Sequence, residues 1–445
     1  MIKSMKFGGT SMGDASSILK CANIVKSNLV SGTTKTIVTV SAVSGVTNRL
    51  LLMSEQVNHT SLIRNNIEAL SIVHDTILKQ IISDREEQKQ IWFKYFVPIL
   101  KELELTCYRN DNSEAKFKAQ VCSFGERLSS LLMLNALQKI GIKSSVVESG
   151  EMIKTDDNYL NASVDFTLTQ ELIKRRLHDL LEDNTTPVVT GFIGQNTAEE
   201  TTLLGRGGSD YTAAIISSAL ESDRLEIWTD VNGIMSTDPR LCSNAYPLEQ
   251  INSELMLEIS CNGAKVLDYK TVLLSIRKNI PIYVYNTFNT DFRGSCVSNS
   301  IRNNSETITS IVSSTKKVLV DLKLPADINT VNSILVSNSL FPSCQVYSKL
   351  SYKFILDSHR LSSRLKEKLD KSAYSTSYID ELTQLSIIGS DVGNSTTMIQ
   401  NIFNKIKIPD IPIHFTYITP DNISIFISYN SRKKIIEQVH NLLEK

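Results

Sequence analysis

The residues best suited to chemistry lie in a glycine-rich segment at residues 203–214, which reads LLGRGGSDYTAA. Glycines at a strand-to-helix junction let backbone N–H groups approach an anion, and the N-terminus of the helix adds positive potential. Arg206 offers a planar fork that suits a carboxylate or a phosphate, and Asp210 could either cap the helix or orient a cation. An ordinary strand–turn–helix corner would have a similar sequence, so a second motif is needed to distinguish it from an anion-binding turn.

The second motif, KFGGTSMG at residues 6–13, places a lysine just before a pair of glycines. The glycines predict a tight turn, and Thr10 or Ser11 could cap the helix that the apolar spacing of residues 18–29 predicts. A Walker loop is excluded, because its lysine follows the glycines. Here Lys6 comes first, so its ammonium would lie at the end of a strand and face the backbone N–H groups of the turn. A structural lysine beside a turn is the alternative.

Composition indicates a soluble enzyme, and a chain of 445 residues suggests about three domains. Lysine plus arginine and aspartate plus glutamate both number 47, which excludes a global basic field for nucleic acid. Seven cysteines without a CxxC pair predict free thiols in a reducing compartment. The lysine motif leaves no room for a signal peptide, and no apolar run is long enough to span a bilayer. We therefore expect a cytoplasmic protein.

Strands alternate with helices around glycine-containing turns up to about residue 48. This alternation predicts an α/β fold with a parallel sheet covered on both faces, whose ligands bind at the carboxyl ends of the strands. Residues 49–109 are polar and helical, and we interpret them as an insertion that forms a lid or wall, with a dimer-facing helical pair as the alternative. Further strands are expected at residues 37–40, 144–147, 187–190, 225–229 and 281–285, a hairpin at 185–203, a helix starting at 263–267, and a linker at 299–305. Residues 385–443 read as strand, loop, helix, strand, strand, helix.

Six short motifs follow one another along the chain: KFGGTS at 6–11, VSA at 40–42, FGE at 124–126, GFIG at 191–194, GRGGSD at 205–210, and WTDV at 228–231 leading to TDPR at 237–240. In this order they closely resemble the aspartokinases, enzymes that phosphorylate the side-chain carboxylate of aspartate. The resemblance is strong over the first two thirds of the chain. It extends more loosely over the last third, as the paired ACT regulatory domains of the lysine-sensitive, monofunctional branch.

The resemblance implies an amino-acid-kinase fold followed by α+β ACT domains. The catalytic domain would span residues 1–298, with the helical insertion at about 49–120. The regulatory region would span 306–445, with a degenerate first ACT-like module at about 315–380 and a second at about 381–445. The implied reaction is ATP- and Mg²⁺-dependent formation of 4-phospho-L-aspartate, the first step toward lysine and diaminopimelate, threonine and methionine. A homodimer through the ACT modules and feedback control by an amino acid are also implied.

The family's roles carry over position by position. Lys6 is expected to bridge the transferring phosphoryl group, and Asp210 is expected to orient Lys6 or Mg²⁺; no dedicated protein metal ligand is expected. In the aspartate subsite, Arg206 would clamp a carboxylate and Glu126 would bind the ammonium. The expected wall residues are Thr47, Phe192 and Ser209, and the expected nucleotide-binding residues are Lys6, Gly8, Gly9, Ser41, Thr229, Asp230, Arg240 and Lys265.

The chemistry fits this set. A carboxylate acceptor is already a nucleophile at neutral pH, so no general base is required, and the six histidines all lie outside the motifs. Taken singly, three residues have plainer interpretations: Glu126 as a first-turn helix residue, Arg240 as a surface turn residue and Lys265 as a solvated lysine. One departure concerns Met235, which stands where the family has a tyrosine bordering the adenine pocket and could serve there as an adaptable apolar wall.

Two other functions are compatible with parts of this pattern. One keeps the fold but changes the acceptor, as in a glutamate, N-acetylglutamate, carbamate or uridylate kinase; the pairing of Glu126 with Arg206 favours a free amino acid. The other is a non-catalytic amino-acid sensor, which predicts loss of Lys6, Arg206 or Asp210, and all three are present. Lysine is the leading effector candidate. Its inhibition is expected to be weaker than is typical of the family, because the loop at residues 323–327 has no glycine and a rigid proline, whereas the loop at 389–393 is intact.

Overall fold

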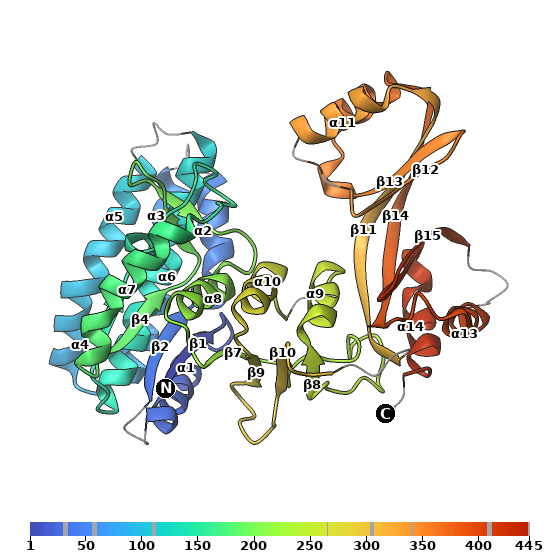
Figure 1. The fold of residues 1–445 in the computed structure, drawn as a ribbon. Helices are drawn as coiled ribbons and strands as arrows, with labels where there is room; N and C mark the ends of the chain where they lie inside the picture. The colour runs from blue at the N-terminus through green and yellow to red at the C-terminus, as the bar shows by residue number, and fades with distance from the viewer. Residues whose placement is uncertain are drawn as a thin grey trace. The chain divides into compact units, whose positions relative to one another are not determined.

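A computed structural model of the protein describes residues 1–29, 34–55, 60–108, 113–264, 266–302, 307–338, 340, 342–406 and 412–443. The chain forms two compact units. The first comprises Met1–Ile234, Pro247–Ser253 and Val266–Ile301, and the second comprises Met235–Tyr246, Glu254–Lys265 and Arg302–Lys445. Figure 1 shows the helices and strands of each.

The first unit is built on an eight-stranded sheet in the order β3-β4-β2-β1-β7-β9-β10-β8. Neighbouring strands are parallel except β9 and β10, which run antiparallel. The strands are β1 (Ile2–Phe7), β2 (Lys35–Val40), β3 (Ser144–Val147), β4 (Thr186–Thr190), β7 (Arg224–Thr229), β8 (Gln250–Asn252), β9 (Ile282–Asn286) and β10 (Ser295–Ser298), with a separate hairpin of β5 (Ile193–Gln195) and β6 (Thr201–Leu203). The mainly parallel sheet confirms the expected fold class.

Helices cover both faces of this sheet, and the alternation of side chains along β1 shows how. Met5 and Phe7 lie in one core with Val40 and with the helices α1 and α6. Lys6 lies between them in sequence and therefore points to the other face, where Asp210 of α8 pairs with it. Helices α7 and α10 pack against α8. The helices are α1 (Ala15–Leu29), α6 (Glu114–Lys139), α7 (Phe166–Glu182), α8 (Gly208–Ala219) and α10 (Tyr269–Lys278), with a 3₁₀ turn η2 at Ser149–Glu151.

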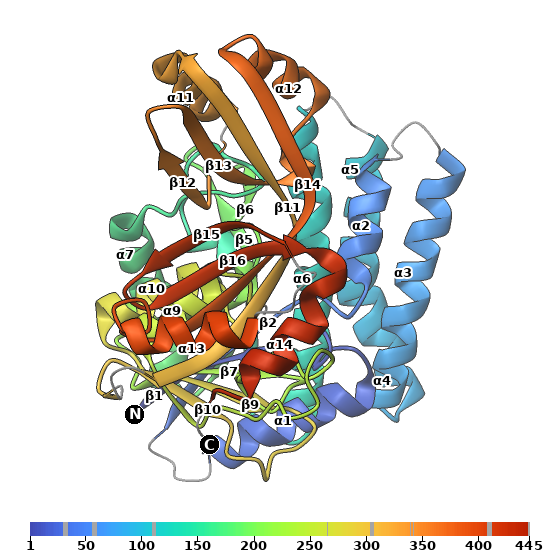
Figure 2. The same ribbon diagram turned by 90° about the vertical axis from the view of Figure 1, so that its right-hand side faces the viewer.

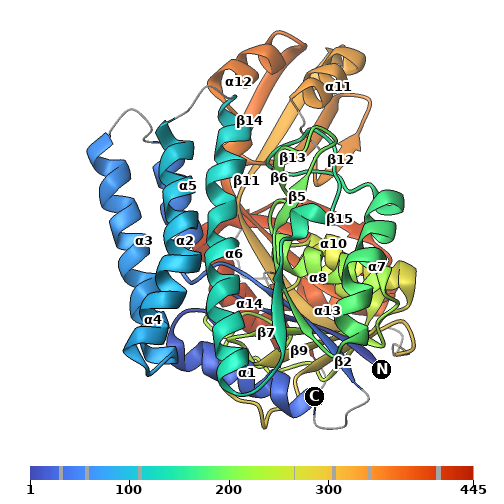
Figure 3. The same cartoon turned by 90° about the vertical axis from the view of Figure 1, so that its left-hand side faces the viewer.

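Residues 49–109 are mostly helical where the structure describes them, as the sequence predicts. They form α2 (Val46–Glu55), α3 (Thr60–Ile81), α4 (Arg85–Ile91), a π-helix η1 (Trp92–Phe96) and α5 (Val97–Tyr108). Figure 3 shows α3 and α5 running alongside the long helix α6, and α2, α3 and α5 all contact α6. The insertion therefore braces the helix on which Glu126 lies.

Two local expectations are wrong. Neither Thr10 nor Ser11 caps α1: the Asp14 carboxylate accepts from Ser17 N–H, because a carboxylate nearer the first turn reaches the free N–H groups better. The helix expected at residues 263–267 begins instead at Tyr269 and is capped by Asp268.

The second unit contains a six-stranded antiparallel sheet in the order β12-β13-β11-β14-β16-β15. Two of its cores include helix residues, one containing Val318 and Leu365 and the other Ile387 and Val439, while a third core contains strand residues such as Leu319 and Phe426. Figure 2 shows α13 and α14 side by side over the sheet of the second core. The strands are β11 (Thr307–Ala326), β12 (Cys344–Tyr347), β13 (Ser351–Asp357), β14 (Ala373–Ser390), β15 (Ile413–Thr419) and β16 (Asn422–Ser428). The helices are α9 (Ser253–Cys261), α11 (Ile328–Ser337), α12 (Ser363–Asp370), α13 (Thr396–Ile406) and α14 (Arg432–His440), with 3₁₀ turns η3 (Ser358–Arg360) and η4 (Tyr429–Ser431).

Two cores on one antiparallel sheet are consistent with paired ACT modules. The long strand β11 serves both: Ile308 and Ile311 belong to one core, and Val318 and Val320 belong to the other. Cys242, from the segment Met235–Tyr246, also packs in the core with Ile308. The functional boundaries given above, 1–298 and 306–445, stay a prediction.

Candidate active site

The carboxyl ends of β1, β2 and β4 meet at the first turn of α8, and one glycine makes this approach possible. A Cβ atom on Gly191, just after β4, would lie 2.5 Å from Ser209 Oγ and 2.8 Å from Val40 O. The Gly191 N–H donates to that same Val40 carbonyl, at 2.9 Å. Any side chain larger than hydrogen would push the strand ends away from the acceptor turn at residues 205–210. The motifs at residues 40–42, 191–194 and 205–210 therefore converge at one edge of the sheet, as the topology rule predicts.

Lys6 and Asp210 form the charged centre of this edge. Lys6 Nζ lies 2.7 Å from Asp210 Oδ1, and both side chains are only 11% exposed. Gly207 takes the N-cap position of α8, with φ of 67°, so Asp210 does not cap the helix. Of the two roles that the sequence leaves open, orienting a cation is the one that fits this geometry. A lysine held beside helix N–H groups can neutralise the charge of a phosphoryl group.

Glu126 is fully buried in α6, close to Lys6. Its Oε1 accepts from the Ala42 N–H at 3.1 Å, while Oε2 has no hydrogen-bond partner among the described residues. Burial raises the pKa of Glu126 to about 8, although the backbone N–H of Ala42 and the ammonium of Lys6 both act to lower it. A buried carboxyl group with a free oxygen is costly to ionise unless a cation arrives. The arrangement suits a substrate ammonium.

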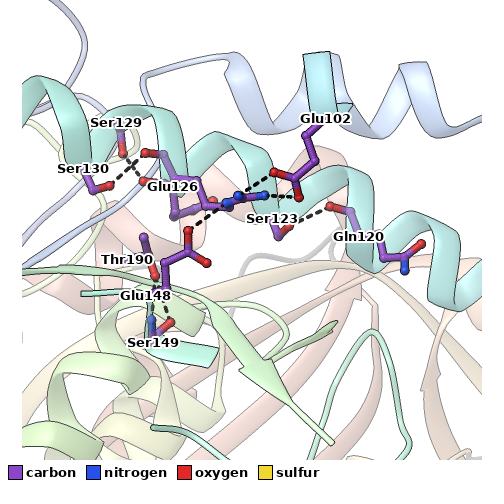
Figure 4. Close-up of polar contacts among 10 residues, drawn as sticks. Glu102, Gln120, Ser123, Glu126, Ser129, Ser130, Glu148, Ser149 and Thr190 are labelled. Atoms are coloured by element: carbon purple, nitrogen blue, oxygen red, sulfur yellow. Dashed lines mark hydrogen bonds and ion pairs between the residues drawn. The ribbon is translucent and has the colours of Figure 1, made fainter. Parts of the chain in front are cut away.

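Arg127, the next residue, fixes this part of α6, and Figure 4 labels its two partners, Glu102 and Glu148. Its guanidinium donates to both oxygens of Glu102 on α5, at 2.9 and 2.8 Å, and to Glu148 Oε1 at 3.0 Å. Ser149, beside Glu148, donates its N–H to Thr190 Oγ1 at the end of β4. The insertion, α6 and the sheet edge are therefore joined by charge-assisted hydrogen bonds around Glu126, and a bidentate pair gives them a defined geometry.

The acceptor turn carries the other expected aspartate-binding residues. Arg206 is exposed, whereas Ser209 is buried against Gly191. Phe192 has a left-handed backbone with φ of 73°, which is uncommon for a bulky residue. Its N–H donates to Thr212 Oγ1 and its carbonyl accepts from Leu204 N–H, both at 2.9 Å. Strain held this firmly is typical of binding sites.

Most of the expected nucleotide residues lie on neighbouring turns of the same edge. The Gly8 N–H donates to Trp228 O at 3.1 Å, and the rings of Phe7 and Trp228 stack, which joins the turn of Gly8 and Gly9 to the end of β7. There Thr229 Oγ1 donates to Asp230 Oδ1 at 3.2 Å.

Ser41 lies on this edge just after β2. Its N–H donates to Phe7 O at 3.1 Å, and its carbonyl accepts from Ser129 Oγ at 2.7 Å. Ser41 is therefore held between the end of β1 and helix α6, where its hydroxyl can serve as a donor to the turn.

Of the remaining three expected residues, one lies in α2, one belongs to the second unit and one is outside the described residues. Thr47 is half-buried in the first turn of α2. Arg240 belongs to the second unit, where its guanidinium pairs with Asp238 at 2.7 Å, and its role toward a nucleotide stays a prediction. Lys265 lies outside the described residues. Met235 is also in the second unit, and its carbonyl accepts from Ser310 Oγ at 3.4 Å.

Sequence reasoning missed Arg127, Asp268 and Lys270. Lys270 donates to Leu204 O at 3.1 Å, and Asp268 packs against Gly207. The only sequence signal for Asp268 was an aspartate directly before the helical residues that begin at Tyr269, and the partners of Arg127 come from distant segments. These contacts position the acceptor turn and α6, and neither could be read from local spacing.

In the described part of the chain, no cluster of three or more histidine, cysteine, aspartate or glutamate side chains could hold a metal ion. None of its helices is long and apolar enough to cross a membrane. The seven cysteines form no disulfide. The site is thus one of lysine, arginine, carboxylates and backbone N–H groups, which suits the positioning and charge neutralisation of phosphoryl transfer.

Comparison with known proteins decides the family. The model of the amino acid kinase family matches residues 1–286. The chain belongs to the amino acid kinase family. It is 28% identical to the aspartokinase of Rickettsia felis over 448 aligned positions, which cover 99% of this chain and 98% of that protein.

Two solved structures of this family extend the comparison. Escherichia coli aspartokinase III in complex with aspartate and ADP (R-state) covers 100% of both chains with a TM-score of 0.88 and 24% identity. The same enzyme in complex with lysine and aspartate (T-state) covers 100% of both chains with a TM-score of 0.79 and 25% identity. The amino-acid-kinase fold expected from the motifs is confirmed: the family model covers residues 1–286, and the two structures align with the whole chain.

Proposed function

We propose that this member of the amino acid kinase family is an aspartate kinase, which transfers the γ-phosphoryl group of ATP to the side-chain carboxylate of L-aspartate. The observation that carries the proposal is Glu126, a buried carboxyl group near Lys6 with one oxygen unpartnered among the described residues. Such a group is suited to bind an ammonium, which aspartate has and N-acetylglutamate, carbamate and uridylate lack. Full-length similarity to an aspartokinase favours aspartate over glutamate.

The acceptor half of the reaction needs no base. A carboxylate oxygen of aspartate attacks the γ-phosphorus, the bond from that phosphorus to the β–γ bridging oxygen breaks, and ADP leaves with the electron pair. Glu126 would hold the substrate ammonium and Arg206 a carboxylate, so that the acceptor oxygen lies in line. The non-catalytic sensor is disfavoured, because it has no use for the Lys6–Asp210 pair.

On the donor side, Lys6 would neutralise charge on the transferring group while the N–H groups of Gly8 and Gly9 hold the phosphates. Thr229 and Asp230 would bind the nucleoside. Mg²⁺ is usually held by one or two carboxylates plus substrate phosphates, and Asp210 and Asp230 are the carboxylates of this edge. The ion would supply charge neutralisation on the phosphates. The absence of a larger carboxylate cluster in the described segments fits that mode.

The direct test measures ADP release with MgATP and each of aspartate, glutamate, N-acetylglutamate and uridylate. Aspartate alone should give rapid turnover. Hydroxylamine should trap the product as the hydroxamate, since an acyl phosphate reacts with it and a phosphate ester does not. Turnover with glutamate and none with aspartate would move the function to another member of the family.

Regulation and assembly form the rest of the proposal. We place lysine as the effector, with weak inhibition, because β11 runs without a glycine loop to the Asp327 cap of α11, and the lysine complex of the E. coli enzyme supports an effector of that kind. A homodimer through the second unit and a cytoplasmic location complete it. Sedimentation with and without lysine would test the dimer.

A further inference from the structure

The first turn of α10 contacts residues on both sides of the acceptor turn. Lys270 Nζ donates to Leu204 O at 3.1 Å and to Asn161 Oδ1 at 2.7 Å. Its ammonium also lies 5.6 Å from the ring centre of Tyr211 on α8. These contacts link α10 to both sides of the turn that carries Arg206, so residues at the start of α10 are well placed to control that turn.

Asp268, the N-cap of α10, lies directly against this turn. Its Oδ1 accepts from the Lys270 N–H at 3.0 Å, which satisfies one free donor of the helix. A Cβ atom on Gly207 would lie 2.4 Å from Asp268 Cβ, 3.0 Å from Cγ and 3.4 Å from Oδ2. Gly207 has φ of 67° and no side chain, so the backbone next to Arg206 rests on the Asp268 carboxylate. Oδ2 faces the turn while Oδ1 caps the helix.

The charges around Asp268 come from the catalytic edge. Burial raises the pKa of Asp268, and the Lys270 N–H and ammonium act to lower it. Asp210 also raises this pKa, whereas the Arg206 guanidinium lowers it. Asp268 is therefore within electrostatic range of both the cation expected to clamp substrate and the carboxylate paired with Lys6. An exposed arginine beside a half-buried carboxylate loses less freedom when it binds an anion.

We propose that Asp268 is a positioning residue for Arg206: its carboxylate, packed against Gly207, directs the guanidinium to the acceptor carboxylate of the substrate. This inference rests on the proposed function, because it takes aspartate as the acceptor. A purely structural alternative is that Asp268 only caps α10. The two can be separated, because asparagine caps a helix about as well as aspartate but carries no charge.

The test compares D268N with wild type in steady-state assays. Positioning predicts that KM for aspartate rises about five- to tenfold, in the range of coupling between neighbouring charged residues. The kcat and the KM for ATP should change less than about twofold, the pattern of a lost binding interaction. D268E, which keeps the charge, should recover part of the affinity. Calorimetric titration of aspartate into each variant gives a readout that does not depend on turnover.

D165N is the matched control. Asp165 caps α7 in the same way, with Oδ1 accepting from Leu168 N–H at 3.1 Å, and it is exposed. It should leave both KM values unchanged. Equal melting temperatures for D268N and D165N would show that the caps survive.

A double-mutant cycle with R206Q tests whether Asp268 acts through Arg206. If Asp268 acts through Arg206, D268N adds little to the aspartate KM of R206Q; if the two effects multiply, the positioning role is overturned. An unchanged aspartate KM in D268N overturns it as well, and leaves a cap. Failure of the proposed function would look different, because wild type itself would not turn over aspartate.

Discussion

Glu126 makes aspartate binding depend on pH in a way that can be calculated. Its pKa in the free protein is raised to about 8, chiefly by burial. At pH 7 only about a tenth of the molecules carry the carboxylate that an ammonium needs, and at pH 6 about a hundredth. Because apparent affinity scales with the competent fraction, the KM for aspartate should fall about tenfold from pH 6 to pH 7. It should fall about fivefold more from pH 7 to pH 8.

The sign follows from the raised pKa. Binding of the ammonium favours the charged form, so aspartate binding below pH 8 should release a proton, close to one per site at pH 7. Calorimetry in buffers of different ionisation enthalpy measures that number directly. The KM for ATP should stay flat over the same range. E126Q should lose the pH dependence and, compared with wild type at pH 8, raise the aspartate KM about 10- to 100-fold, the cost of a hydrogen bond to a charged group.

E182Q is a suitable control, since Glu182 pairs with Lys35 on an exposed surface and should leave both the KM and its pH profile unchanged. A wild-type aspartate KM that is flat from pH 6 to pH 8 would refute the reasoning. So would an E126Q variant that keeps the wild-type profile, because another group would then be titrating.

Four further outcomes are expected. Lys6→Met should fold normally and lower kcat by about 10³-fold or more, because the ammonium acts mainly on the transition state; circular dichroism with initial rates checks this, and full turnover would remove Lys6 from catalysis. Arg206→Ala should chiefly raise the KM for aspartate and Lys265→Ala the KM for ATP, and a reversed pattern would mean that the subsites are exchanged. His74 is buried with its pKa lowered to about 4 by burial, so its contribution to stability is full above pH 6.5 and is lost as the pH falls toward 4. Between pH 7 and pH 4.5 the loss should be about 2.5 kcal/mol. His74→Leu should reduce this loss in urea titrations at the two pH values, and an equal loss in both proteins would contradict it. Lysine should inhibit only weakly and raise the melting temperature; strong inhibition at low lysine would contradict the weakened site, and no response in either assay would remove lysine as the effector.

Much of the fold follows from local pattern. The strand at residues 144–147 lies where it was expected, the one expected at 187–190 begins one residue earlier, and the one expected at 281–285 is shifted by one residue at both ends. Short apolar runs between turns are typical of buried strands. The meeting of Lys6 with Asp210 also follows, since parallel strands share one carboxyl edge. In these cases the structure is determined by residues that are close in sequence and by a general rule of sheet topology.

Other parts depend on contacts between distant residues. The helix expected at 263–267 begins later because Asp268 supplies both a cap and a charge beside the acceptor turn. Glu102 and Glu148 meet on Arg127 only after α5, α6 and the end of β3 have packed together. A carboxylate on a helix surface has many equivalent positions in a sequence, so spacing alone could not single these out.

The position of the segment Met235–Tyr246 also depends on contacts between residues that are distant in sequence. It follows the Thr229–Asp230 turn in the chain, yet it packs in the second unit. There Ser236 Oγ lies 2.9 Å from His440 Nε2 on α14 and accepts from the Tyr246 N–H at 3.0 Å. The Ser236 carbonyl accepts from Ile311 N–H of β11.

The segment that carries Arg240 is therefore hydrogen-bonded to the six-stranded sheet, through β11, and to α14. An effector that favours one arrangement of that sheet must bias this segment directly, because the two share hydrogen bonds. If Arg240 binds nucleotide, control of ATP affinity needs no long chain of intermediate contacts.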